Sequence, residues 1–307
     1  MTILWQVVSN HSYRFAMIPK NSGNPFFDVA YNGCDEEAKR LSYLSNTSII
    51  CDYVAPASES EDELAARQQV QILEDMIQEK SYDGIVISAL NAELLTPTID
   101  AAMAANIPIV TYDSDAAESK RLIHIGTDNF AFGDMLGSLL LQHSPLGGKY
   151  TIVTVFPSPN LAQRVEGVLH ALDRSEWTYI GPVGGVDGKG STEESLIVMH
   201  DLASNPNLNA IIPVLGGPMF DFEGWKEFVT TYANLTLVVG DAISTQIELL
   251  ELGFVNGLVG QLPSEMGRKS VQTLVKVLNK EETQDTLAKQ DPTWTCQHSN
   301  SKVVQSS

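Results

Sequence analysis

The fold class is indicated most clearly by Ile107-Pro108-Ile109-Val110-Thr111-Tyr112-Asp113-Ser114-Asp115, where a short β-branched run ends in polar and acidic residues. Other apolar runs end at small or polar residues in the same way, and a helical pattern follows each of them. Their ranges are 15–21, 83–88, 150–158, 210–217 and 235–241. This alternation predicts βαβ units in parallel sheets, which bind ligands at the carboxyl ends of their strands.

Length and charge limit the possible organisation and partners. A chain of 307 residues is long for one core and suits two lobes, each of roughly 100 to 150 residues. The formal net charge is −19, from 38 acidic and 19 basic side chains. Such a field repels phosphate backbones and anionic lipid, so nucleic acid is not an expected partner.

Motifs for catalysis or metal binding are missing from the sequence. It contains no Gly-x-Ser-x-Gly elbow and no His-Glu-x-x-His pair, and its six histidines show no ligand spacing. The glycine-rich run 184–191 lacks the phosphate-loop spacing, so we expect a surface turn there. We therefore predict a binding protein with no catalytic residues, no metal and no cofactor.

The three cysteines, Cys34, Cys51 and Cys296, are too few and too scattered for a disulfide framework or a zinc site. The simplest expectation is that they are buried or idle thiols. The alternative is a Cys34–Cys51 bridge from the first helix to the second strand, which requires an oxidising compartment.

Location is open at this stage. No apolar run reaches the roughly 18 residues needed to span a bilayer. The first ten residues lack the basic flank and apolar core of a signal peptide. The protein is therefore expected to be either cytosolic or secreted by a signal that this chain does not contain.

Periodicity divides the predicted elements into two similar series. The first has strands at 13–18, 83–87, 107–112 and 122–125, with helices at 61–79 and 92–105 among those between them. The second has strands at 150–156, 178–183, 210–215, 235–239 and 258–260. About 25 polar residues at the end are expected to form an irregular strap and tail.

At this point the chain resembles a known family, the type I periplasmic binding proteins of the sugar-binding, ribose-binding-protein-like group that serve ABC importers. The resemblance is carried by Ile18-Pro19-Lys20-Asn21 with Asn24-Pro25-Phe26-Phe27, by the strand ends Ser88 and Asp113, and by two presumed lobe crossings. The crossings read Ile125-Gly126-Thr127-Asp128-Asn129 and Val259-Gly260-Gln261-Leu262-Pro263. These segments occur in the family's order from residue 13 to about 280.

The resemblance implies an α/β fold of two similar doubly wound parallel-sheet lobes joined by a hinge, the periplasmic binding protein-like I architecture. The N-terminal lobe would be discontinuous, residues 1–126 plus 262–290. Residues 127–261 plus 291–307 would form the C-terminal lobe and the tail. Hinges near 126–127, 260–261 and 291 would let the lobes close on a ligand.

The resemblance also implies how a sugar is held. Hydroxyls need charge-assisted hydrogen bonds, and Asp113, Arg164, Asp241 and Gln261 match the family's positions for them. Each residue also has a purely structural interpretation. Asp113 would be a loop or cap carboxylate, and Arg164 would be an ordinary exposed arginine of a helix. Asp241 and Gln261 would form hydrogen bonds with backbone groups of the hinge.

Aromatic residues are expected to contact the apolar face of the sugar. Phe26 and Phe27 are the candidates from the first lobe, and we expect only one of them, Phe27, to face the cleft. The segment Met219 to Trp225 could supply an aromatic lid around Phe220, although helical spacing favours core packing for at least two of its large side chains.

The identity of the sugar is the least determined feature. Lys20 and Asn21 follow Ile-Pro, as a lysine does in the family's branch that binds the sugar-like signal autoinducer-2. Arg164 belongs instead to the ordinary sugar pattern. Ser114 stands where an arginine commonly follows the aspartate, and Gly217 lies in a Gly-Gly-Pro that replaces the usual Asn-Asp.

The function implied is capture of a sugar or polyol and its delivery to the permease of an ABC importer by a monomeric, periplasmic or otherwise extracytoplasmic protein. One alternative is the ligand-sensing module of a membrane sensor or an autoinducer-2-type signal binder. A LacI-type repressor is disfavoured, because no helix-turn-helix precedes the first strand and the net charge is −19.

Overall fold

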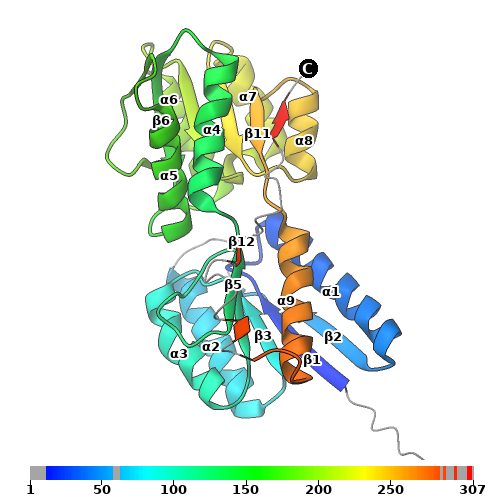
Figure 1. Ribbon diagram of the computed structural model, residues 1–307. Helices are drawn as coiled ribbons and strands as arrows, with labels where there is room; N and C mark the ends of the chain where they lie inside the picture. Colours follow the sequence, from blue (N-terminus) through cyan, green and yellow to red (C-terminus); the bar gives the residue numbers. More distant parts are fainter. Residues whose placement is uncertain (1–11, 58–62, 284–285, 288–293, 296–302, 306–307) are drawn as a thin grey trace, which may run out of the picture.

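The computed structural model describes residues 12–57, 63–283, 286–287, 294–295 and 303–305. Within these ranges the chain forms two α/β lobes, one above the other, joined by a narrow waist (Figure 1). Each lobe contains one sheet with helices on both faces, which confirms the predicted fold class. No helix in the described ranges combines the length and the apolar character needed to cross a membrane.

The first lobe is built on a six-stranded sheet in the order β12-β5-β4-β3-β1-β2, in which neighbouring strands run parallel. Its strands are β1 (Ser12–Ile18), β2 (Ser48–Tyr53), β3 (Gly84–Ile87), β4 (Ile109–Tyr112), β5 (Ile123–Gly126) and β12 (Trp294–Thr295). Its helices are α1 (Pro25–Ser45), α2 (Glu63–Glu79), α3 (Ala92–Ala104) and α9 (Pro263–Leu278). Helices α1 and α9 cover one face, and α2 and α3 cover the other.

The second lobe has a seven-stranded sheet whose main order is β13-β11-β10-β9-β6-β7, with β8 beside β6. Its strands are β6 (Gly148–Thr154), β7 (Trp177–Tyr179), β8 (Val186–Asp187), β9 (Ala210–Pro213), β10 (Thr236–Gly240), β11 (Gly257–Val259) and the antiparallel β13 (Val303–Gln305). Its helices are α4 (Asn129–His143), α5 (Pro159–Leu172), α6 (Thr192–Ala203), the short 3₁₀ turn η1 (Gly217–Met219), α7 (Phe222–Thr231) and α8 (Ser244–Glu251).

The inner strands of each sheet are buried because both faces of the sheet are covered. Every residue of β3, β4 and β9 is buried, as expected for the inner strands of a parallel sheet. The first helix begins where the sequence indicates: Asn24 caps α1 by accepting a hydrogen bond from the Phe26 amide, and Pro25 occupies the first turn.

One close helix pair in each lobe depends on glycine. A Cβ atom on Gly267 of α9 would lie 1.9 Å from the Ala30 carbonyl oxygen of α1. A Cβ atom on Gly133 of α4 would lie 1.9 Å from the Arg164 carbonyl oxygen of α5. The α4–α5 contact fixes the backbone at Arg164, one of the residues predicted to bind the ligand.

The structure corrects two expectations about chain paths. The predicted strand 178–183 ends at Tyr179 as β7, and a separate strand, β8, follows a turn in which Gly184 and Gly185 have φ angles of +86° and +97°. We assigned all of 291–307 to the second lobe, but Trp294–Thr295 pairs with β5 in the first sheet. β13, in contrast, pairs with β11 of the second sheet.

Cys34 and Cys51 form a disulfide that joins α1 to β2, with 6.1 Å between their Cα atoms. The expectation of idle thiols is therefore wrong for this pair, and the alternative bridge is the arrangement found. Proximity in the fold, which spacing alone cannot give, brings the two sulfur atoms together. Cys296 lies outside the described residues.

Replacing both Cys34 and Cys51 by alanine should lower the free energy of unfolding by about 3 kcal/mol, because a cross-link across 17 residues restricts the unfolded chain. Urea unfolding with and without reductant measures the effect. Reductant should shift the midpoint of the wild type and leave that of the double variant unchanged. Equal midpoints for oxidised and reduced wild type would contradict the prediction.

Candidate functional site

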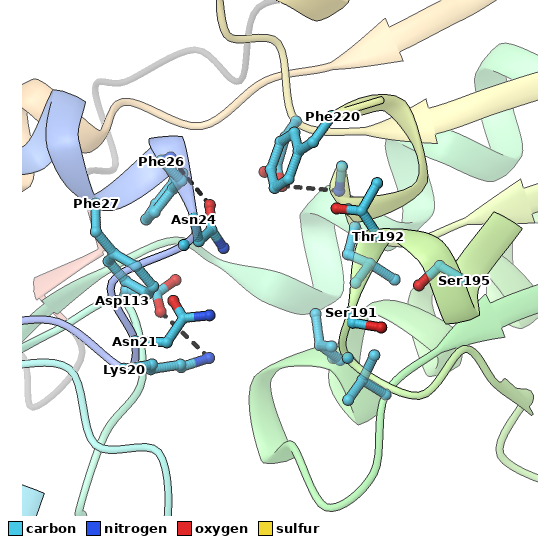
Figure 2. A pocket seen from close by; sticks show the side chains of 18 of the residues that line it. Lys20, Asn21, Asn24, Phe26, Phe27, Asp113, Ser191, Thr192, Ser195 and Phe220 are labelled. Atoms are coloured by element: carbon cyan, nitrogen blue, oxygen red, sulfur yellow. Dashed lines mark hydrogen bonds and ion pairs between the residues drawn. The ribbon is translucent and has the colours of Figure 1, made fainter. Parts of the chain in front are cut away.

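A cavity of about 270 Å³ lies between the lobes at the carboxyl ends of both sheets, and we call it the site cleft. All the residues predicted for the ligand site line it: Lys20, Asn21, Phe26, Phe27, Asp113, Arg164, Gly217, Asp241 and Gln261. Figure 2 shows the wall from the first lobe facing the wall from the second across an open space. Their role in binding remains a prediction.

Asp113 forms the acidic centre of the first wall. It follows β4 directly and adopts a left-handed backbone with φ +56°, a conformation that is uncommon outside glycine and often found at functional positions. The Ser88 hydroxyl donates a 2.9 Å hydrogen bond to its Oδ2 atom. The Lys20 ammonium lies 3.4 Å from the same oxygen, and both charged side chains are buried. A paired carboxylate is thus held at the cleft surface.

The aromatic part of this wall is Phe26 and Phe27, at the start of α1. Phe27 packs edge-on against Tyr112, with ring centroids 6.1 Å apart, and Phe26 packs edge-on against Phe27. Both phenylalanines line the cleft, so the expectation that only one of them faces it is wrong. The first turn of α1 approaches the cleft end-on, which brings successive side chains to it.

Asp241 and Gln261 connect the second wall to the lobe crossings. Asp241 follows β10 with φ +72°, as Asp113 follows β4, and its Oδ2 atom accepts a 3.0 Å hydrogen bond from the Gly216 amide. Its Oδ1 atom accepts from Gln261 at 2.6 Å. The Thr127 hydroxyl donates to the side-chain Oε1 atom of Gln261 at 2.7 Å, so the side chains of two crossing segments are hydrogen-bonded to each other.

Arg164 is the buried cation of the second wall, with 2% of its side chain exposed. Its guanidinium donates to Asn129 at 2.8 Å and to the Val214 carbonyl at 2.9 Å, and it lies 4.1 Å from the centre of the Phe132 ring. The Asp241 carboxylate is 3.9 Å away. Burial lowers the pKa of Arg164, whereas the charges of Asp241 and Asp113 raise it.

Several cleft residues were not expected from the sequence. The tip and first turn of α6 contribute Gly190, Ser191, Thr192 and Ser195, although we expected the run 184–191 to be only a surface turn. Asn160, in the first turn of α5, also lines the cleft. The signal available in the sequence was that each residue lies in a loop from a strand to a helix or in the first turn of that helix. Only part of the segment Met219 to Trp225, considered above as an aromatic lid, reaches the cleft. Phe220 lines the cleft, whereas Met219 and Trp225 are fully buried in the core.

The second wall therefore carries three hydroxyls opposite the carboxylate, amide and aromatic groups of the first (Figure 2). Ser191 caps α6 by accepting from the Glu194 amide, and the Ser195 hydroxyl donates to the Gly188 carbonyl. The residues that the structure describes include no group of three or more metal-ligating side chains. The arrangement suits reversible binding of a neutral, hydroxyl-rich molecule.

Two α/β lobes that enclose a polar cleft between their strand ends define a two-lobed solute-binding protein. A family model described as a periplasmic binding protein domain matches residues 15–282. The chain belongs to that family.

Relatives and solved structures agree with this assignment. The ribose import binding protein of Escherichia coli K12 is 23% identical over 273 residues, which cover 88% of this chain and 86% of that protein. Its counterpart in Bacillus subtilis 168 is 21% identical over 268 residues, 86% of this chain and 81% of that protein. An ABC transporter solute-binding protein from Burkholderia graminis C4D1M, solved with D-arabinose, is 25% identical with a TM-score of 0.77, covering 90% of this chain and 92% of that one.

Proposed function

We propose that this protein captures a neutral monosaccharide or polyol in the site cleft and delivers it to an ABC importer. The observation that carries the proposal is the pairing of Asp113 and Asp241, each at the end of a strand with a left-handed backbone, on opposite walls of one cleft. The ribose import function of curated relatives and the D-arabinose bound to a solved neighbour support the same ligand class.

The charges of the cleft balance. Lys20 lies beside Asp113 and Arg164 lies near Asp241, so the two cations offset the two carboxylates. The other polar groups are amides and hydroxyls, which both donate and accept hydrogen bonds. A sugar hydroxyl also does both, whereas a phosphate needs converging donors without adjacent carboxylates. The aromatic rings at the start of α1 provide a surface for the C–H face of a sugar.

Isothermal titration calorimetry with D-ribose, D-arabinose, D-allose, D-fucose and xylitol tests the proposal. Saturable binding of at least one of them is expected. A wider thermal-shift screen of sugar acids and nucleosides identifies other ligand classes. Binding of those compounds alone, with no response to any neutral sugar or polyol, would overturn the proposed ligand class.

Sugar phosphates should bind at least tenfold more weakly than the corresponding sugar, a difference of roughly 1.4 kcal/mol. The reason is that each cation of the cleft lies beside a carboxylate, so a phosphate would find no converging donors free of negative charge. Calorimetry with D-ribose and D-ribose 5-phosphate, at equal ionic strength, makes the comparison. Tighter binding of the phosphate ester would contradict this interpretation of the cleft charges.

Ligand binding should close the lobes about the crossings at 126–127 and 260–261. The two walls are separated by open space in Figure 2, and a bound sugar would contact both. Small-angle scattering should show a smaller radius of gyration with saturating sugar. At a hundredfold excess over the dissociation constant, the ligand should add about 2.7 kcal/mol to the free energy of unfolding. An unchanged radius with a bound sugar would contradict hinge closure.

Membership of the periplasmic binding protein family implies an extracytoplasmic location. The Cys34–Cys51 bridge is in keeping with an oxidising compartment.

In the proposal the protein acts as a monomer and its membrane partner is an importer permease. Sugar-dependent stimulation of the ATPase of the reconstituted importer tests the partner. Sugar-dependent binding to a membrane sensor, without such stimulation, would replace transport by sensing.

A further inference from the structure

A second cavity, of about 660 Å³, adjoins the site cleft between the lobes. The first lobe contributes the start of α3 and the residues that follow β4, and the second lobe contributes the starts of α4 and α5. Its volume exceeds the 270 Å³ of the site cleft. A single sugar ring held at Asp113 and Arg164 would leave this second space unfilled.

The two cavities share two residues, Asp113 and Asn160, which line both. Asn160 is 9% exposed, and its Oδ1 atom has no hydrogen-bond partner among the described residues. A buried acceptor of this kind costs free energy unless a ligand or a water molecule donates to it. The junction between the cavities thus presents an acceptor to a molecule that extends through it.

The second cavity differs in chemistry from the site cleft. Apolar surface comes from Ala92, Pro97, Ala117 and Pro159. Asp115, a partly buried carboxylate of this cavity, is paired with Arg121 and accepts a 2.7 Å hydrogen bond from Thr111. The carboxylates of Glu93 and Glu118 also line the cavity but are exposed to solvent, whereas the alanine and proline residues supply its apolar surface.

We propose that the second cavity receives the apolar aglycone of a glycoside whose sugar ring lies in the site cleft. This inference rests on the proposed function and extends its ligand class from free sugars to glycosides with a small apolar or aromatic substituent. The sugar hydroxyls bind between Asp113 and Arg164. The substituent passes Asn160 and lies against the alanine and proline surface, where lobe closure removes it from water.

Calorimetry with D-arabinose, D-fucose and their phenyl glycosides, each glycoside in both anomeric forms, tests the inference. One anomer of at least one phenyl glycoside should bind roughly tenfold more tightly than the free sugar, because part of the ring leaves water on binding. The corresponding methyl glycoside should show little of this gain, because it has less apolar surface.

A cavity-filling variant locates the effect. Ala117→Trp places a large side chain in the second cavity, at an exposed turn outside the site cleft. It should remove the phenyl advantage and leave free-sugar affinity within about twofold of the wild type. Ala104→Trp is the matched control, because Ala104 is exposed at the far end of α3 and lines neither cavity. It should bind both ligands as the wild type does.

The outcomes separate this inference from the proposed function. Binding of free sugar with no gain for any phenyl glycoside would overturn the second-cavity inference and leave the proposed function standing. A phenyl gain that persists in Ala117→Trp would also overturn it, because the ring would then lie elsewhere. Failure of all free sugars and all glycosides to bind would overturn both.

Discussion

Arg164→Ala should lower the free energy of unfolding by about 3 to 5 kcal/mol and weaken sugar binding by about 2 to 4 kcal/mol. The substitution removes the cation near Asp241, leaves the Val214 carbonyl without this donor and opens space over Phe132. The expected loss of stability is large because a guanidinium with 2% exposure is part of the core of the lobe.

Urea unfolding and calorimetry measure the two effects separately. Arg174→Ala is the matched control, because Arg174 follows the same helix with 92% of its side chain exposed and should change stability by less than about 0.5 kcal/mol. Arg164→Lys keeps the charge but lacks the planar fork that reaches Asn129 and Val214 together. Wild-type affinity in Arg164→Ala would place the ligand outside the site cleft.

Asp113→Asn should weaken sugar binding by about 2 to 4 kcal/mol, roughly a thirtyfold to thousandfold loss. The amide has the same shape but lacks the charge, so it loses the ion pair with Lys20 and forms weaker hydrogen bonds to sugar hydroxyls. Asparagine also tolerates the left-handed backbone at φ +56°, so the backbone should stay in place.

Two further variants separate charge from backbone. Asp113→Gly accepts the positive φ without cost and removes the carboxylate, so it should lose as much affinity as Asp113→Asn or more. Asp173→Asn is the surface control, because that aspartate is 69% exposed at the end of α5. If Asp113→Asn bound sugar like the wild type, the carboxylate would have only a structural role beside Lys20 and Ser88.

Local pattern predicted much of the site because its residues stand where strands end. The ends of short β-branched runs placed Asp113 after β4 and Asp241 after β10. The binding roles predicted for these two residues, and for Gln261, Phe26 and Phe27, came from the resemblance to the family. Strand ends depend on neighbours within a few residues, and parallel sheets then gather them at one edge.

Pattern did not predict the hydroxyls of Ser191, Thr192 and Ser195, because a polar turn before a helix looks the same whether it faces solvent or a cleft. The pairing of Trp294–Thr295 with β5 was also missed. A two-residue strand has too few residues to show a period, and its partner lies far away in sequence.

The sequence by itself determined the alternation of strands and helices, the parallel α/β class and the candidate positions for binding a hydroxyl-rich ligand. Tertiary structure decided the Cys34–Cys51 bridge, the ion pairs Lys20–Asp113 and Arg164–Asp241, and the second cavity beside Asn160. The physical reason is the distance along the sequence over which each interaction acts. Periodicity and turn chemistry act between near neighbours, whereas an ion pair, a disulfide or a cavity depends on the distance between segments that only the packed lobes bring together.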